Sequence, residues 1–363
     1  MSRLDAEQRI RREQARLDCG ANGRDAEAPV HVLMEPMAER AARNPEWIWK
    51  YWLASGKLQI LAGSPGTGKT TIALWMAAIL SSGSRWLGDD ADTPARDVII
   101  WSGEDTLDDV ILPRLISMGA DLHRIFAVRA VLDGEEIRAF DPARDMPALE
   151  RILAGRDVGL VILDPIILAI TGDAHKSVDV RRGLEAVGAM AEATAASVLG
   201  ISHFSKGTAG RDPLERVTGS LAFGAVCRLV MGVTEDKESG DFRFCRMKSS
   251  NGPSKGGWRY RLHPCEVGER VETVRVEWGE AVEGSASEIL GAADANEEVR
   301  EERSALEDAR MFIRSALADG AVPSRTLLVD ARDAGHSGPT IQRAMRSLTE
   351  SRKEGKVWYA SLK

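Results

Sequence analysis

Residues 60–78, ILAGSPGTGKTTIALWMAA, hold three glycines, one lysine and three threonines, with the spacing of a phosphate-binding loop. Gly63, Gly68, Lys69 and Thr70 satisfy the Walker A pattern, G-x-x-x-x-G-K-[ST]. Glycines let backbone N–H groups converge on phosphate oxygens without clashes from Cβ atoms, and the helix that follows points the positive end of its dipole at the same anion. We therefore predict that this loop binds a nucleoside triphosphate. Lys69 would contact the β- and γ-phosphates and Thr70 would bind Mg²⁺. The predicted nucleotide contacts are Gly63, Ser64, Pro65, Gly66, Thr67, Gly68, Lys69, Thr70 and Thr71.

A second ligand for the metal ion is expected at Asp164, which ends the apolar run 158–163. A carboxylate inside a buried strand would be costly, so a position at the end of the strand, over the nucleotide, is the natural resolution. The sequence therefore predicts a magnesium site made by Thr70 and Asp164.

Hydrolysis also needs a carboxylate that orients or deprotonates the attacking water. Pro165 follows Asp164, so no glutamate occupies that position, and Glu104 instead follows another apolar run, 97–102. Because neighbouring parallel strands end at the same edge of a sheet, we expect Glu104 to face the γ-phosphate, with Asp105 as the alternative. The guanine-reading motif Asn-Lys-x-Asp is absent, which favours ATP over GTP.

Strands and helices alternate along the chain up to about residue 203, which predicts a parallel sheet in a doubly wound α/β domain. The strands are expected at 57–63, 96–104, 123–130, 158–166 and 196–203, and the helices at about 69–81, 105–119, 147–155 and 178–195. Beyond residue 220, shorter alternating runs that begin with AVCRLVMGVT predict antiparallel strands added at the sheet edge.

Composition narrows the class of protein. The chain has 363 residues, a net charge of −7 and no apolar run long enough to span a membrane, and its four cysteines lack the spacing of a zinc site. The N-terminal residues lack the apolar core of a signal peptide, so a cytoplasmic location is expected. The tryptophans of residues 47–53 are expected to pack on the core rather than to stack on bases.

These motifs together resemble the RecA/DnaB superfamily, and within it the RepA-type plasmid and phage ATPases, the AAA_25-like group of ring helicases. The stretches ISHFSKG (201–207), VTGSLAFGAVCRLVM (217–231) and MKSSNGPSKGGWRYRL (247–262) resemble further motifs of that group. The resemblance implies a RecA-like P-loop NTPase core, mostly parallel with antiparallel edge strands. It also implies a homo-oligomer, most simply a hexamer, with DNA in its central channel.

The same resemblance assigns roles to three more residues. His203 would sense the γ-phosphate, and Arg228 or Lys248 would reach a nucleotide across a subunit interface. Structural roles are the alternatives for all three: His203 could be a structural histidine, Arg228 could be paired within its apolar strand, and Lys248 could be a solvated residue of an edge strand. The loop 204–220 would face the channel, where Lys206, Arg211 and Arg216 could follow a phosphate backbone; a mobile surface loop is the alternative.

The tail, residues 304–363, is predicted to be a winged helix-turn-helix. Three helices are followed by a hairpin, and the charge changes from −5 over 285–310 to +4 over 311–363. The last helix would direct Gln342, Arg343 and Arg346 toward the major groove of DNA. A protein-binding winged helix is the alternative.

We thus expect an arm at 1–45, a RecA-like ATPase domain at 46–282, an acidic linker at 283–303 and the tail at 304–363. The predicted function is an ATP-hydrolysing ring motor on DNA, most simply a replicative helicase. The alternatives are a RecA-like recombination ATPase, an ATP-switched DNA-binding regulator and a small-molecule kinase, the last disfavoured by the tail and by the lack of an acceptor-binding lid.

Overall fold

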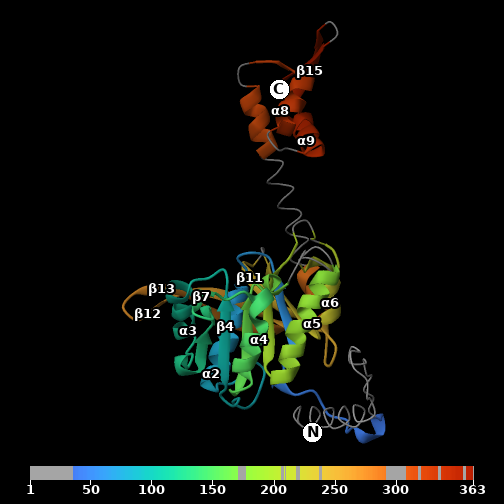
Figure 1. Ribbon diagram of the computed structural model, residues 1–363. Coiled ribbons are helices and arrows are strands. Elements are labelled where there is room, and N and C mark those ends of the chain that lie inside the picture. The colour runs from blue at the N-terminus through green and yellow to red at the C-terminus, as the bar shows by residue number, and fades with distance from the viewer. Residues whose placement is uncertain are drawn as a thin grey trace.

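The computed structural model describes residues 36–170, 177–205, 208, 210–217, 221–236, 239–291, 308–317, 320–333, 337–354 and 357–362 (Figure 1). Most of the predicted arm, 1–45, and most of the predicted linker, 283–303, lie outside these residues.

One large sheet forms the centre of the fold. Its strands are β3 (Leu58–Gly63), β4 (Asp97–Ser102), β5 (Ile125–Ala127), β8 (Val158–Asp164), β9 (Ser197–His203), β10 (Leu229–Asp236), β11 (Asp241–Ser249), β12 (Gly257–Val267) and β13 (Val271–Val282). They lie in the order β13-β12-β11-β10-β3-β9-β8-β4-β5. All strands from β10 to β5 in this order run parallel, whereas β11, β12 and β13 are antiparallel to their neighbours. This large, mostly parallel α/β sheet fits a RecA-like P-loop core.

Strand β10 corrects one expectation from the sequence. We expected the run 225–234 to be an antiparallel edge strand, but its first two residues end helix α6 (Leu221–Val226), and β10, which begins at Leu229, pairs in parallel with β3. The physical reason is the crossover. The chain leaves β9 at the carboxyl edge of the sheet and returns through α6 to the amino edge before β10 begins. The antiparallel extension therefore starts at β11.

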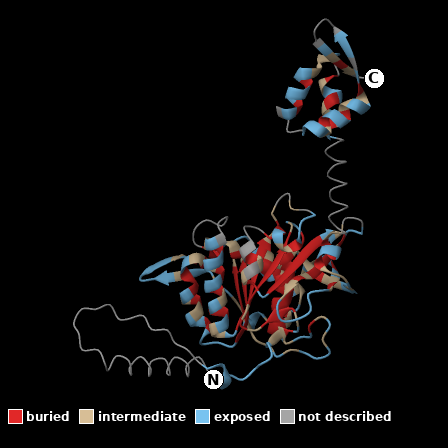
Figure 2. Cartoon of the chain, turned by 90° about the vertical axis from the view of Figure 1, so that its right-hand side faces the viewer, coloured by how far each residue is buried: buried red, intermediate tan, exposed pale blue. Residues whose placement is uncertain are grey.

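Alternate residues of the inner strands point to opposite faces, and each face has its own apolar core. Leu61, Val98 and Ile100 join one core with α2 (Lys69–Ser82) and α3 (Leu112–Ser117). The opposite core contains Ile60 and Ile99, together with α4 (Pro142–Leu153) and α5 (Ser177–Thr194). The strands between these two layers are almost wholly buried, as Figure 2 shows.

On the face of the sheet that α2 covers, aromatic side chains pack against the antiparallel strands. Trp49 at the end of β1 (Trp47–Trp49) stacks on Trp52 and Trp86, and Trp52 stacks on Phe244 and lies against Trp258. Trp49 and Trp52 are buried, so the expectation that these tryptophans pack on the core is confirmed for both.

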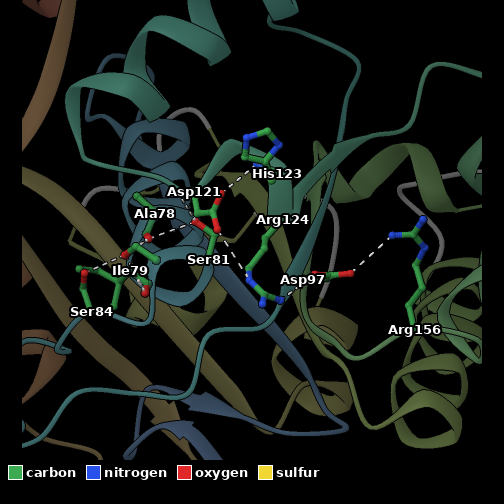
Figure 3. A network of polar contacts seen from close by, with 10 residues as sticks. Ala78, Ile79, Ser81, Ser84, Asp97, Asp121, His123, Arg124 and Arg156 are labelled. Atoms are coloured by element: carbon green, nitrogen blue, oxygen red, sulfur yellow. Dashed lines mark hydrogen bonds and ion pairs between the residues drawn. The ribbon is translucent and has the colours of Figure 1, made fainter.

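Polar contacts fix the start of β4 at the amino edge of the sheet (Figure 3). Asp97 accepts hydrogen bonds from Arg124 at 3.4 Å and from Arg156 at 3.5 Å. Asp121 joins this group because its Oδ2 lies 3.7 Å from Arg124 Nε, and its backbone N–H donates to Ser81 Oγ of α2 at 3.1 Å. Beyond β5 the chain forms a hairpin, β6 (Ala130–Asp133) and β7 (Glu136–Ala139), that the sequence did not lead us to expect.

The tail has a small apolar core of its own. It comprises helical residues 308–316, α8 (Ser324–Asp333), α9 (Gly338–Leu348) and a sheet of β14 (Val322–Pro323), β16 (Val357–Leu362) and β15 (Thr349–Glu354). Ser337 caps α9 by accepting a hydrogen bond from the backbone N–H of Thr340. Ile341 and Ala344 of α9 are buried in this core. None of the helices in the described part of the chain is both long enough and apolar enough to cross a membrane.

Candidate nucleotide-binding site

The parallel strands bring the predicted catalytic groups to one edge of the sheet. His203, at the end of β9, pairs with Gly63 at the end of β3, and Asp164, at the end of β8, pairs with Ser102 at the end of β4. The loop that contains Glu104 begins directly after Ser102, and its Gly103 N–H donates to the Asp164 carbonyl at 2.7 Å. Residues that are up to 140 positions apart in sequence therefore meet at the carboxyl edge.

The loop between β3 and α2 has the backbone that its glycines permit. Gly66 and Gly68 have φ angles of +79° and +76°, a left-handed conformation that L side chains rarely adopt. Helix α2 starts at Lys69, immediately after Gly68, so its N–H groups and dipole face the hollow of the loop. At Gly63 a Cβ would lie 2.3 Å from Val233 Cγ2 of β10, so a larger residue cannot occupy the start of the loop.

Lys69 lies inside this loop. Its side chain is 6% exposed, and Nζ donates to the Ser64 carbonyl at 2.9 Å. Burial lowers the Lys69 pKa, while the carboxylates of Asp164 and Glu104 act to raise it. A desolvated ammonium beside two carboxylates is poised to exchange the Ser64 carbonyl for a phosphate oxygen.

Thr70 and Asp164 are in contact, as a shared metal site requires. Thr70 Oγ1 donates to Asp164 Oδ2 at 2.7 Å. Asp164 is 2% exposed, and its Oδ1 is buried with no hydrogen-bond partner among the described residues. Burial raises the Asp164 pKa to about 6; the Thr70 hydrogen bond opposes this rise, and Glu104 and Asp105 add to it. A hydroxyl beside a buried carboxylate fits a hard divalent cation such as Mg²⁺, because Oδ1 of this carboxylate is left to bind the ion.

Glu104 and His203 face each other across the strand ends. Glu104 Oε1 lies 3.6 Å from His203 Nε2, and about half of the Glu104 side chain is exposed. Asp105, the alternative carboxylate, pairs with Arg114 Nη1 at 3.3 Å. Glu104 is the more exposed of these two carboxylates, so it is the better placed of the two to contact water.

A family model described as an AAA domain, AAA_25, matches residues 25–209, just over half of the chain. The chain belongs to this family. The comparison of this chain with curated proteins found no match. The matched AAA domain includes the phosphate-binding loop, Glu104, Asp164 and His203, so the chain is a P-loop ATPase. Strands β10 to β13 and the tail lie beyond the match.

Arg228 and Lys248 lie far from this edge. Arg228 precedes β10, whose first residue pairs with Gln59 near the start of β3, so it sits at the amino edge of the sheet. Arg228 is exposed and lies just before β10, so the expectation that it sits within an apolar strand is wrong. Lys248 pairs with Val230 near the same edge, and its Nζ donates to the Gly224 carbonyl of α6. Neither residue lies near the candidate nucleotide site of the same chain.

The basic residues after β9 have three different outcomes. Lys206 lies outside the described residues. Arg211 is exposed. Arg216 is 3% exposed, and its guanidinium stacks over the Phe204 ring at 4.4 Å. A buried arginine cannot follow a phosphate backbone at the surface, so Arg216 is better assigned to holding this segment together.

The three DNA candidates of the tail, Gln342, Arg343 and Arg346, share the exposed face of α9.

The sequence did not indicate that β12 would contact the phosphate-binding loop, although Trp258, Tyr260 and Leu262 alternate as residues on one face of a strand do. Tyr260 donates a hydrogen bond to the Thr67 carbonyl, and Leu262 packs on Gly68.

Proposed function

We propose that this AAA ATPase is a DNA-associated ring motor, a replicative helicase of the RepA type. The observation that carries the proposal is the separation between the phosphate-binding loop and the two candidate cations, Arg228 and Lys248. The phosphate-binding loop lies at the carboxyl edge of the sheet, whereas Arg228 and Lys248 lie at the amino edge. A cation that completes the site would have to come from a neighbouring subunit, and a head-to-tail contact repeated by rotation closes into a ring.

The residues of the site have separable roles in this proposal. Lys69 and the N–H groups of the loop hold the β- and γ-phosphates, and Glu104 orients the attacking water. Mg²⁺, held by Thr70 and Asp164, would neutralise charge on the phosphate oxygens. These roles use the described geometry without rearrangement of the strands.

His203 is placed to report the state of the site to the segment that follows it. The contact between His203 and Glu104 spans β9 and β4, and the next residue, Phe204, bridges to Val217 and carries the guanidinium of Arg216 on its ring. A change at Glu104 would therefore pass through His203 into 204–217, the segment proposed to face DNA. Among the described cations of that segment, Arg211 is exposed and Arg216 is buried.

The tail supports a second contact with DNA. Helices α8 and α9 and the β14–β16–β15 sheet suit a winged helix-turn-helix, with α9 as the helix that enters the major groove. This feature alone would also suit an ATP-switched regulator that binds duplex DNA without translocation.

The test is the ATPase rate with and without single-stranded DNA, measured together with the native mass in the presence of an ATP analogue. A motor is expected to show faster hydrolysis on single-stranded DNA, a closed oligomer and unwinding of a forked duplex. Open filaments would favour the recombination ATPase. Duplex binding without unwinding would favour the regulator.

A further inference from the structure

Strand β12 crosses the outer side of the phosphate-binding loop and contacts it at two consecutive residues. Its same-face residues Tyr260 and Leu262 meet Thr67 and Gly68, respectively. Tyr260 is 1% exposed, and its hydroxyl donates to the Thr67 carbonyl at 2.5 Å. Burial raises the Tyr260 pKa well above its ordinary value, so the hydroxyl keeps the proton that it donates. The contact is therefore a buried hydrogen bond, which is costly to leave unmade.

The geometry of the peptide bond gives this contact a consequence for the nucleotide. In a planar trans peptide the carbonyl and the N–H of the next residue point in opposite directions. Because the Thr67 carbonyl points toward β12, the Gly68 N–H points away from β12. Gly68 ends the loop directly before α2, where the N–H groups that face a bound phosphate lie.

Two features keep this peptide in place. Gly68 has a φ of +76°, and a Cβ at Gly68 would lie 2.6 Å from Leu262 Cδ2, so only glycine fits between the loop and β12. On the other side of the loop, Thr67 Oγ1 donates to the Ser64 carbonyl at 2.8 Å. Thr67 is thus held through its side chain by the loop and through its carbonyl by β12.

We propose that Tyr260 is a positioning residue of the nucleotide site, which holds the Thr67 carbonyl so that the Gly68 N–H points at the phosphates. The inference rests on nucleotide binding at residues 63–71 and is independent of the ring and of DNA. It makes the antiparallel extension, which lies outside the AAA domain match, part of the phosphate cradle.

The variant Tyr260→Phe tests the proposal, because it keeps the ring and removes only the hydroxyl. The peptide between Thr67 and Gly68 then loses its anchor, and its N–H loses its fixed direction. We expect the Kd for Mg-ADP to rise by about fivefold to tenfold, which is the effect of one hydrogen bond to a buried carbonyl. Because a β-phosphate contact acts equally in the ground and transition states, KM for ATP should rise while kcat stays nearly constant.

The matched control is Trp278→Phe. Trp278 lies in the same aromatic cluster, with its ring centroid 5.5 Å from that of Tyr260, and it makes no described contact with the loop. The Trp278→Phe variant should have a lower Tm and an unchanged Kd for Mg-ADP, which separates loss of packing from loss of positioning. Lys69→Ala supplies the reference for lost binding.

Wild-type affinity in Tyr260→Phe would overturn the proposal, and so would an equal rise of Kd in Trp278→Phe. If Lys69→Ala also bound nucleotide like the wild type, the site itself would be wrongly placed. If Lys69→Ala lost binding while Tyr260→Phe did not, only the role of Tyr260 would fail.

Discussion

At the scale of single residues, Asp164 is the most strongly perturbed carboxyl of the site, and it makes binding depend on pH. Burial raises its pKa from 3.8 to about 6. Below that pH the carboxyl keeps a proton that a cation must displace. We expect the affinity for Mg-ATP to fall by about tenfold for each pH unit below 6, as one-proton linkage requires. Titrations between pH 5 and 8 measure this slope.

Without ligand, the effect of the Asp164 proton on the stability of the folded protein should have the opposite sign to its effect on Mg-ATP affinity. Because the Asp164 pKa is higher in the folded than in the unfolded chain, the proton favours folding, and the contribution of Asp164 to stability, measured as the difference from Asp164→Asn, should rise as the pH falls from about 6 toward 4. Asp164→Asn should remove both dependences. An Mg-ATP affinity that is constant from pH 7 to pH 5 in the wild type would contradict this account of Asp164.

Glu104 is expected to act in hydrolysis and not in binding. Glu104→Gln keeps the size and polarity of the side chain but cannot orient or accept a proton from water as a carboxylate does, so kcat should fall by roughly 10²- to 10⁴-fold with the nucleotide Kd unchanged. Asp105→Asn is the matched control, because Asp105 is occupied by Arg114. Stopped turnover in Asp105→Asn with normal turnover in Glu104→Gln would move the role to Asp105.

At the scale of elements, the close approach of β9 to its neighbours depends on Gly200. A Cβ there would lie 2.8 Å from Ile166 Cβ and 3.0 Å from Ile60 Cδ1. Gly200→Ala should therefore destabilise the protein by about 1–3 kcal/mol, the usual cost of overpacking a core. Chemical denaturation measures the change.

Gly188 in α5 provides the matched control for Gly200, because nothing lies within 4 Å of the Cβ that alanine would add. Gly188→Ala should stabilise the protein by about 0.5–1 kcal/mol through helix propensity. Equal stabilities of the two variants would mean that β9 is less closely packed than described.

The elements also show which features the sequence could predict. Thr70 and Asp164 were predictable because Thr70 follows the loop after one apolar strand and Asp164 ends another, and parallel strands end at a common edge. The direction of β10 was not, because it depends on where the crossover through α6 returns the chain. Likewise, the hydrogen bond from Tyr260 to Thr67 joins residues 193 positions apart, and no local pattern encodes such a contact. Arg228 was assigned to an apolar strand because its neighbours are apolar, yet it lies just outside β10.

At the scale of the whole molecule, the proposed ring makes one prediction that a monomer cannot fulfil. Lys69→Ala and Arg228→Ala should each be inactive, because one lacks the lysine of the loop and the other lacks the cation given to the neighbour. Mixed in equal amounts, they should recover activity at about one interface in four, where an intact loop meets an intact Arg228. ATPase assays of the mixture measure this recovery.

A mixture with no recovered activity would contradict the role of Arg228 across the interface. The same mixing experiment with Lys248→Ala tests the other candidate. Lys57→Ala, at a partly exposed lysine near the amino edge of the sheet, is the control and should be fully active by itself.

The central claim is that ATP and its metal ion bind at the carboxyl edge of the sheet, between the ends of β3, β8 and β4. Its most direct test is the structure of the Glu104→Gln variant with ATP and Mg²⁺. The account predicts phosphates against Gly68, Lys69 and Thr70, with the metal ion bound by Thr70 and Asp164. Nucleotide at any other place, or a metal ion without Asp164 among its near neighbours, would contradict it.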